Sequence, residues 1–463
     1  MNYRMESDSI GSLQIPVDAY YGVQSKRGHD NFFITGNLMN ITFIKNIVKI
    51  KKAAAIVNLG AKTLKKDIAD AIVKACDEIL EGKFLDQFIS DAIQGGAGTT
   101  VNMNVNEVIA NRASEILGGV KGEYTLCHPN DHVNMAQSTN DVIPTAGKLT
   151  VLELSKKLLE NLKSLIEVLI EKSKEFNNVI KMGRTQLEDA VPIRLGQEFN
   201  AYASALKRDY GRVEYVLKEM HSINLGGSAI GTAVNVSKQY LDNIAGELSK
   251  ITGFEMVKAN DLIDATQNVD CFASVSSCLK TMSINLSKIS NDLRLMSSGP
   301  KTGLEEITLP AMQNGSSIMP GKVNPVIPEV VSQVAFAVIG NDVTISMASE
   351  GGQLELNAFE PVIFYKLFES LTCLTNAMDT LNKNCIKGIV ANKEHCQNLL
   401  DKSVGVVTAL CPYIGYKKAA EIAKESLATN IKIRDLVVKY GLLNEKELDE
   451  ILDPFKMTEP KQN

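Results

Sequence analysis

The chain contains no tryptophan and only five histidines among its 463 residues. Its eight cysteines form no C-x-x-C pair, and the sequence has no H-E-x-x-H motif and no clustered carboxylate motif. These absences argue against a zinc site and against a thiol redox motif, so we expect no obligatory metal. In a large intracellular chain, the cysteines are expected to be reduced and buried thiols.

Charge of one sign and long apolar runs are also scarce. The formal net charge is −5, and lysine and arginine are scattered along the chain. This argues against nucleic acid as a partner, because a nucleic-acid surface needs a clustered basic face. The first residues are polar, unlike a signal peptide, and no window approaches the ~20 apolar residues of a membrane span. We therefore expect a cytoplasmic protein without a membrane partner.

Helical periodicity dominates the centre of the chain. Leu154, Leu158, Leu162, Leu165 and Leu169 form one apolar stripe of helical spacing, and strand-like alternation is scarce throughout. Long helices joined by glycine- and proline-containing breaks predict a mainly all-α protein with a central bundle. The other helices expected from such patterns cover residues 41–59, 67–81, 193–220, 265–297, 326–350, 359–381 and 417–429.

The most informative segment has the sequence GSSIMPGKVNP and covers Gly315–Pro325. It resembles the phosphate loop G-x-x-x-x-G-K-[ST], but five residues separate its glycines and Val323 stands where a metal-binding hydroxyl is needed. The nucleotide interpretation therefore fails. The composition instead predicts a mobile loop that approaches an anion. It carries Ser316 or Ser317 as a candidate nucleophile or base beside the positive charge of Lys322.

Two further hydroxyl-rich loops precede predicted helices, at Thr99–Thr100 and at Ser138–Asp141. Unpaired N–H groups at a helix start, with the helix dipole behind them, favour a bound carboxylate. Plain N-capping is the alternative for each loop taken alone. A third segment, Gly226–Gly231, lacks a preceding strand and the glycine spacing of a dinucleotide site, so we expect a loop that connects helices.

These motifs together resemble the aspartase/fumarase superfamily, whose members cleave C–N or C–O bonds by β-elimination and release fumarate. GSSIMPGKVNP matches the signature of the superfamily. Further matching blocks follow in the family's order at Gly95–Thr100, His128–Asp131, Gln137–Asp141 and Gly183–Gln186. Within the superfamily the chain looks most like the aspartate ammonia-lyases. The resemblance thus implies that L-aspartate is converted to fumarate and ammonia.

The resemblance also implies an architecture. The expected assembly is a homotetramer in which each active site draws loops from three subunits. No cofactor is obligatory, although divalent cations activate some aspartases. The implied domains are a mostly helical N-terminal domain (1–140), a central helical bundle (141–391) and a small helical C-terminal domain (392–463).

Individual residues acquire roles through the same resemblance. Ser316 matches the base that removes a proton from Cβ, which leaves a doubly charged aci-carboxylate to be stabilised by prepositioned donors. Lys322 and Asn324 are expected to bind the α-carboxylate. The β-carboxylate is expected to lie among Thr99, Ser138, Thr139 and Ser317, and the ammonium to face Asn140, Thr185 and Gln186.

Position 186 distinguishes deamination from dehydration. Fumarases have a histidine in their G-R-T-H motif, whereas this chain has Gln186. A departing hydroxide needs a proton that an amide does not supply at neutral pH, but an ammonium leaves as neutral ammonia without an acid. Gln186 therefore favours deamination. The alternatives are a fumarate hydratase and a non-catalytic helical scaffold of the same superfamily.

The H-P-N-D segment has two interpretations. In fumarases it is tied to a second dicarboxylate site, which here would involve His128, Asn130 and Asp131. A turn followed by a helix start is an adequate structural explanation of the same residues.

Overall fold

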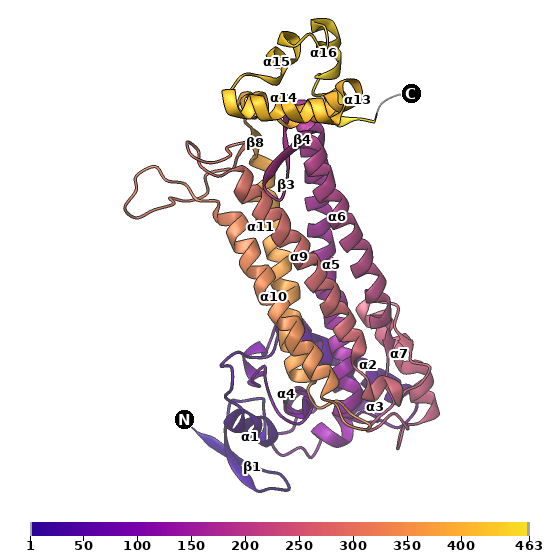
Figure 1. Cartoon of the computed structure of the whole chain (residues 1–463). Coiled ribbons are helices and arrows are strands. Elements are labelled where there is room, and N and C mark those ends of the chain that lie inside the picture. The colour runs from indigo at the N-terminus through magenta and orange to yellow at the C-terminus, as the bar shows by residue number, and fades with distance from the viewer. Residues whose placement is uncertain (1, 461–463) are drawn as a thin grey trace. The chain divides into compact units, whose positions relative to one another are not determined.

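The computed structural model describes residues 2–460, and these are mainly α-helical, as predicted (Figure 1). The strands of this part of the chain pair only into two-stranded sheets. Two compact units can be distinguished. This division differs from the predicted partition into three consecutive domains, because each unit combines separate segments of the chain. The three-domain partition stays a prediction. Unit 1 comprises Met1–Leu158, Gly211–Thr281 and Phe336–Leu374, and unit 2 comprises Leu159–Tyr210, Met282–Ala335 and Thr375–Asn463.

Five long helices contribute residues to both units. In the helix that covers Thr139–Glu175, the predicted leucine stripe is confirmed from Leu158 onward. Leu158, Leu162, Leu165 and Leu169 are at most 1% exposed, whereas Leu154 is only half buried. The helix expected over 265–297 is interrupted, because Asn268 is extended. The five helices are α5 Thr139–Glu175, α6 Leu195–Val216, α9 Asp270–Met296, α10 Val326–Glu350 and α11 Glu360–Asn384.

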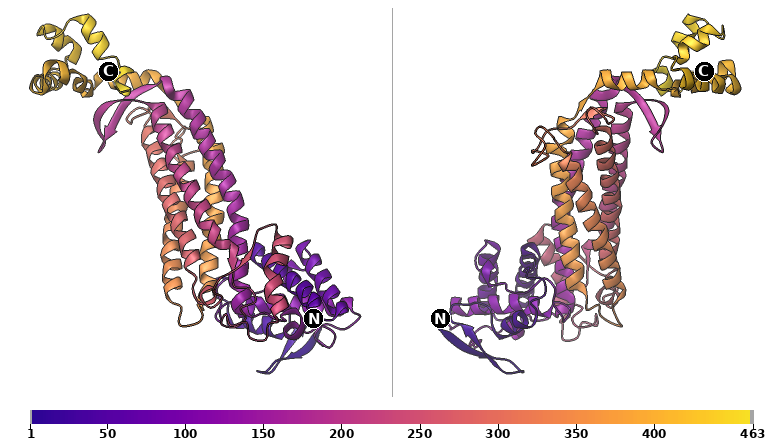
Figure 2. Two further views of the ribbon diagram at one scale, coloured as in Figure 1. Left: turned by 90° about the vertical axis from the view of Figure 1, so that its right-hand side faces the viewer. Right: turned by 60° about the vertical axis from the view of Figure 1, so that its left-hand side comes forward.

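Within each unit, the segments of these helices lie side by side (Figure 2). In unit 1, Gly147 of α5 packs against the ring of Phe364 on α11, and a Cβ at position 147 would lie 2.3 Å from that ring. Glycine therefore allows the close approach of the two helices. In unit 2, the hydroxyl of Tyr202 on α6 donates to Asp292 on α9 at 3.0 Å. This partly buried polar bond helps to fix the register of two helices whose apolar faces alone would allow sliding.

Unit 1 also contains the shorter N-terminal helices that the sequence predicts. α2 and α3 confirm the helices expected over 41–59 and 67–81. The remaining elements of unit 1 are β1 Tyr3–Ser7, β2 Ser12–Pro16, α1 Val23–Asn31, α2 Ile41–Gly60, α3 Lys66–Leu80, α4 Thr99–Ile116, β5 Ser222–Ile223, α7 Lys238–Thr252, β6 Val257–Lys258 and α8 Asp264–Gln267.

Unit 2 ends in a group of short helices with a small apolar core of its own, which includes Leu410, Ile422, Leu436 and Leu448. Asn444 caps the last α-helix through a capping box with Glu447. The remaining elements of unit 2 are β3 Ile180–Thr185, β4 Glu188–Arg194, β7 Ile307–Thr308, β8 Val390–Ala391, α12 Lys393–Lys402, α13 Cys411–Ile414, α14 Tyr416–Thr429, α15 Ile433–Lys439 and α16 Glu445–Ile451.

One helix of residues 2–460 is long and apolar enough, by composition, to cross a membrane. The most apolar window of α10 has a mean hydropathy of 1.4, and 39% of that window is buried. The helix itself was expected over 326–350, but the expectation of no membrane-length window missed its apolar character, because valine and alanine occupy its exposed face as well as its buried face. A helix that packs inside a globular protein or an assembly has the same composition.

The cysteines are all free thiols. Five are buried as expected, and burial raises the pKa of Cys127 and Cys385 to about 12, so these thiols stay protonated. Cys278, Cys373 and Cys411 are only half buried, which corrects the expectation for these three.

Candidate active site

The segment between α9 and α10 extends from the helices as a long loop, on the left of Figure 1. The part that carries the signature is closed at its base. The N–H of Gly315 donates to the carbonyl of Lys322 at 2.8 Å, and Nδ2 of Asn324 donates to the carbonyl of Gly315 at 2.6 Å. A Cβ at position 315 would lie 2.6 Å from the Lys322 carbonyl. Glycine at this position therefore lets the loop close.

Ser316 is half buried within this loop. Its Oγ accepts hydrogen bonds from the backbone N–H groups of Ile318 at 3.2 Å and Met319 at 2.9 Å. The same bonds that stabilise the turn also place two donors on the oxygen that would carry the charge of an alkoxide. The geometry therefore lowers the cost of deprotonating Ser316.

Ser317 and Lys322 are exposed on the same loop. Lys322 makes no ion pair with any residue between 2 and 460, so its ammonium is free to bind an external carboxylate. A lysine ammonium acts as a compact point charge with three donors, which suits an anionic ligand.

The second loop, Ser138–Asn140, leads into α5 and is half buried. Oγ of Ser138 accepts from the N–H of Asn140 at 3.3 Å, so the capping alternative holds in part for this loop. Oγ1 of Thr139 accepts from Nδ2 of Asn102 at 3.3 Å, which links the loop to α4. As an acceptor in this bond, the Thr139 hydroxyl keeps its own proton for a ligand.

The side-chain amide and the backbone carbonyl of Asn140 are both bonded to the loop after β5, and the first of these bonds orients the amide. Nδ2 of Asn140 donates to the carbonyl of Ala229 at 2.7 Å, and Nδ2 of Asn224 donates to the backbone carbonyl of Asn140 at 3.0 Å. Because the amide nitrogen is engaged, Oδ1 is the end of the side chain that remains available as an acceptor. That orientation suits the predicted contact with an ammonium.

Thr99 is the first residue of α4 and is exposed. Its Oγ1 donates to the carbonyl of Gly96 at 2.8 Å, and the first turn of the helix is capped instead by Oε1 of Gln94, which accepts from the N–H of Val101 at 2.9 Å, so Thr99 is not the capping residue. Gly98, with a φ of +88°, precedes the helix in the left-handed region. A Cβ at position 98 would also meet Ile143 at 3.0 Å, which explains glycine there.

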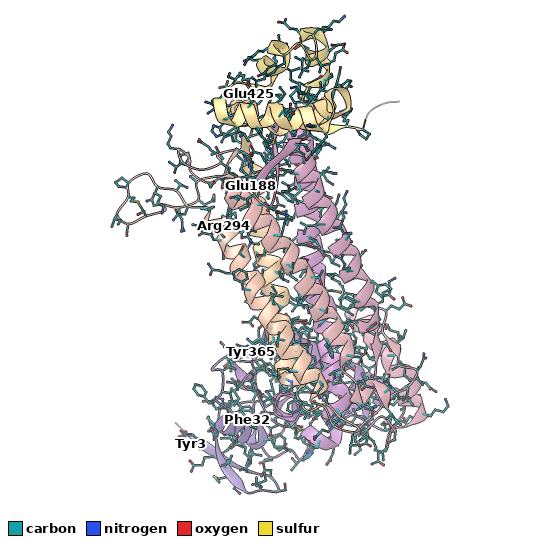
Figure 3. The ribbon with its side chains drawn as sticks, in the orientation of Figure 1. Tyr3, Phe32, Glu188, Arg294, Tyr365 and Glu425 are labelled. Atoms are coloured by element: carbon teal, nitrogen blue, oxygen red, sulfur yellow. The ribbon has the colours of Figure 1, made fainter. Side chains whose placement is uncertain are left out.

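Thr185 and Gln186 lie at the tip of the β3–β4 hairpin, which the sequence analysis did not anticipate. Thr185 stands opposite Glu188, labelled in Figure 3, and both are exposed. Gln186 and Leu187 form the turn with φ values of +55° and +68°. Positive φ at both central residues is typical of the two-residue turns whose twist matches that of the flanking strands.

A buried ion network fixes the body of this hairpin. Glu306 is 0% exposed and binds Arg184 at 2.6 Å and Lys181 at 2.8 Å. Burial alone would lower the pKa of Lys181, but the charges of Glu198 and Glu306 raise it above its ordinary value. The hairpin that carries Thr185 is therefore bonded to the segment that leads into the 315–325 loop.

The H-P-N-D segment forms a capped turn at Pro129–Val133. Nδ1 of His128 accepts from the N–H groups of Asn130 and Asp131, each at 3.2 Å. The turn interpretation accounts for these bonds. Nε2 then carries the ring proton, and the second dicarboxylate site stays a prediction.

The candidate residues are divided between the two units. Among the described residues, no hydrogen bond joins the candidate residues of one loop to those of another. No group of three or more His, Cys, Asp and Glu side chains that could hold a metal ion is found within residues 2–460. Unit 1 contains Thr99, Ser138, Thr139 and Asn140, and unit 2 contains Thr185, Gln186, Ser316, Ser317, Lys322 and Asn324.

Sequence reasoning missed the supporting residues Asp141, Arg184 and Glu306. Asp141 and Arg184 lie inside matched motifs, and a carboxylate three residues after Ser138 is a recognisable capping signal. Glu306 had no such signal, since it is far in sequence from the hairpin that it binds. The stretch after Gly226 also differs from expectation, because the two-residue strand β5 precedes it. Two of its N–H groups are engaged by Asp141 instead of an external phosphate.

Comparisons with known proteins agree over the whole chain. A sequence model described as lyase matches residues 11–340, and one described as fumarase C C-terminus matches residues 406–459. Aspartate ammonia-lyases from Bacillus sp and Escherichia coli are 52% and 47% identical to this chain over 457 and 462 residues. These alignments cover 99% of this chain and 98% and 97% of the relatives.

Solved structures share the fold. A fumarate lyase:delta crystallin from Brucella melitensis, bound to cobalt, has a TM-score of 0.96 and 48% identity, covering 99% of this chain and 100% of that one. A class II fumarase from Schistosoma mansoni has a TM-score of 0.96 at 36% identity and full coverage of both chains. With the ordered motifs and the helical architecture, these matches show that the chain belongs to the aspartase/fumarase family of lyases.

Proposed function

We propose that this chain is an aspartate ammonia-lyase, which releases ammonia from L-aspartate by a reversible anti β-elimination and leaves fumarate. The observation that carries this function is the 47–52% identity to aspartate ammonia-lyases over nearly the whole chain. The test is the ultraviolet absorbance of fumarate formed from L-aspartate and, separately, from L-malate. Fumarate from L-aspartate is expected. Its formation only from malate, or from neither compound, would contradict the function.

Ser316 is the proposed base. Its alkoxide removes a proton from Cβ, and the electron pair moves into the β-carboxylate to form the aci-carboxylate. That intermediate then expels ammonia from the adjacent carbon and leaves the double bond of fumarate. The two N–H groups that point at Oγ of Ser316 support this role, because they stabilise the charged form of the hydroxyl.

Donors for the two carboxylates come from different loops. The hydrogen bonds from the hydroxyls assigned to the β-carboxylate become stronger when the second charge develops there. They therefore stabilise the transition state more than the bound substrate, which lowers the barrier. The free ammonium of Lys322 and the amide of Asn324 bind the α-carboxylate, whose charge does not change. The hydroxyl donors are Thr99, Ser138, Thr139 and Ser317, and the oxygens assigned to the substrate ammonium belong to Asn140, Thr185 and Gln186.

The chain is proposed to act as a homotetramer with sites shared by three subunits. The exposed face of α10 supports assembly, since Phe336, Val343 and Met347 are 63%, 56% and 69% exposed and recur at spacings of seven and four. An apolar stripe of that spacing is typical of helices that pack against other helices. The separation of the candidate residues into loops without mutual hydrogen bonds is consistent with sites completed by neighbouring copies.

The proposed mechanism places neutral donors around the β-carboxylate, where the charge develops, and one lysine at the α-carboxylate, so it needs no obligatory cofactor. A divalent cation would act only as an activator, and it would bind to residues other than these. The cytoplasm is the proposed location, because the substrate and product of the proposed reaction, L-aspartate and fumarate, are small intracellular metabolites.

Replacing Lys322 by methionine is expected to raise the KM for L-aspartate by about 10- to 100-fold, the range for loss of a charged hydrogen bond. Because the α-carboxylate keeps one charge throughout the reaction, kcat should change much less. Initial rates of fumarate release over a range of aspartate concentrations measure both constants. Lys301→Met, at another exposed lysine between α9 and α10, is the matched control and should leave KM unchanged. Equal effects of the two variants would contradict the assignment.

A fumarate hydratase is the alternative function, and the full-length match to a class II fumarase shows that the fold alone does not exclude it. Gln186→His tests the distinction. The imidazole can protonate a departing hydroxide, so weak malate dehydration should appear while deamination falls by about tenfold. A wild-type protein that already dehydrates malate faster than it deaminates aspartate would favour the alternative. The scaffold alternative is disfavoured, since Ser316, Lys322 and Asn324 are all present.

A further inference from the structure

Asp141 follows the Ser138–Asn140 loop directly and is 0% exposed. Its two carboxylate oxygens bind two different segments of unit 1. Oδ1 accepts from the N–H of Ser138 at 2.9 Å. Oδ2 accepts from the N–H groups of Gly226 and Ser228, each at 3.0 Å. The carboxylate therefore joins two loops that lie more than 80 residues apart in sequence.

Helix capping explains only the first of these bonds. A carboxylate in the first turn of a helix commonly accepts from the N-cap N–H, as Oδ1 does with Ser138. The bonds of Oδ2 serve no helix end, because they go to the loop that follows β5. The carbonyl of Ala229 in the same loop also accepts from the Asn140 amide, and Nδ2 of Asn224 donates to the backbone carbonyl of Asn140. The arrangement thus orients the loop beyond what a cap requires.

We propose that Asp141 is a positioning residue for deamination. Its carboxylate clamps the Ser138–Asn140 segment onto the Gly226–Ala229 loop, so that the hydroxyls of Ser138 and Thr139 and the oxygen of Asn140 are held toward the substrate. This inference rests on the proposed function of that segment. Asp141 itself touches no substrate, since its two oxygens are occupied by backbone donors and the side chain is fully buried.

The charges around Asp141 keep the clamp ionised near neutral pH. Burial raises the pKa of Asp141 to about 6, opposed by its three N–H donors and by the ammonium of Lys51 on α2. Tyr240 of α7 is the other titratable group beside it, and burial raises the pKa of that phenol, so it is neutral. Burial lowers the pKa of Lys51 to about 7, and its Nζ donates to Asn134 at 2.8 Å. A proton on Oδ1 would oppose the N–H of Ser138, so acid should release the loop.

Asp141→Asn tests the clamp with almost no change of shape. An amide has one oxygen, so an asparagine that keeps Gly226 and Ser228 must turn its NH₂ group toward the N–H of Ser138. We expect kcat for deamination to fall by about 100-fold, the effect of a displacement of about 1 Å in positioning groups. The KM should change less, because the released hydroxyls act mainly on the charge that develops in the transition state. Amide hydrogen exchange at residues 138–140 should become faster.

Glu107→Gln is the matched control. Glu107 is also a buried carboxylate of unit 1, at 1% exposed, and accepts from the N–H groups of Gly22, Gln24 and Ser25 at 2.8, 2.9 and 3.0 Å. It holds the start of α1 and no candidate loop. Its loss should destabilise the protein without changing exchange at 138–140 and should leave kcat within about twofold of the wild type. A similar loss of kcat in both variants would overturn the proposal.

A pH profile gives a readout that a purely structural role would not move. In the wild type, kcat should fall as the pH drops through about 6. Lys51→Met removes the opposing ammonium, so the acid limb should move upward by about one pH unit, while Glu107→Gln leaves it in place. An unmoved limb in Lys51→Met would contradict the clamp.

The outcomes separate the two proposals. If the assembled wild type deaminates aspartate and Asp141→Asn retains its kcat, the positioning role is wrong and the function stands. If the wild type forms no fumarate from aspartate, the proposed function fails. Hydrogen exchange at residues 138–140 then still decides whether Asp141 holds the loop, and unchanged exchange in Asp141→Asn would overturn the clamp.

Discussion

Replacing Ser316 by alanine is expected to lower kcat for deamination of L-aspartate by about 10³- to 10⁴-fold, the upper range for loss of a general base. The variant retains the loop closure between Gly315, Lys322 and Asn324, which does not use the serine hydroxyl. The KM should therefore change little. The rate of fumarate formation, measured on protein whose assembly matches the wild type, determines the effect.

Ser317→Ala is the matched control for this variant. It removes a hydroxyl from the neighbouring position, where the side chain is assigned to the β-carboxylate and not to proton removal. A loss of about tenfold, one hydrogen bond to a charged group, is expected. The assignment of the base would be contradicted if Ser316→Ala kept the original rate, or if Ser317→Ala caused the larger loss.

The second large effect concerns assembly. Phe336→Arg places a charge in the exposed stripe formed with Val343 and Met347 on α10. If that stripe is the contact between subunits, each copy of the charge is buried without a partner, and the tetramer should dissociate. Because the sites are proposed to be shared, activity should fall by more than about 100-fold although the chain stays folded. Light scattering gives the mass, and circular dichroism the helical content.

Leu427→Arg is the control for assembly. Leu427 of α14 is 71% exposed and lies outside the stripe, so the same substitution should leave both the mass and the activity unchanged. A monomeric Phe336→Arg protein with full activity would refute shared sites. A tetrameric one would show that the stripe is not the contact.

The helical part of the fold was predictable because its signal is local. The leucine spacing of α5 is confirmed by burial from Leu158 onward, since 3.6-residue periodicity needs no knowledge of partners. The interruption after Gln267 was not predictable, because Asn268 lies in a sequence that is compatible with a continuous helix.

The β3–β4 hairpin shows where local patterns fail. Its turn residues Gln186 and Leu187 have positive φ, yet neither is the glycine or asparagine that usually marks such a turn. Its stability comes instead from the contacts of Lys181 and Arg184 with Glu306, more than 120 residues away. No pattern within the hairpin contains that information.

The candidate site was found through its motifs, but its support was not. The motifs identify Ser316 and Asn140, and the bonds to Ser316 come from its own motif, whereas the bond that orients the Asn140 amide goes to the distant residue Ala229. Asp141 is similar. Its cap to Ser138 is visible in the sequence, whereas its bonds to Gly226 and Ser228 require the fold.

The most direct test of a single base that acts on one face of the substrate is the reverse reaction in deuterated water. The protein is mixed with fumarate and ammonia, and the L-aspartate formed is analysed by proton NMR. We expect one deuterium at Cβ, in a single configuration anti to the new C–N bond, and almost none with Ser316→Ala. Deuterium shared equally between the two Cβ positions, or full incorporation by Ser316→Ala, would contradict the account.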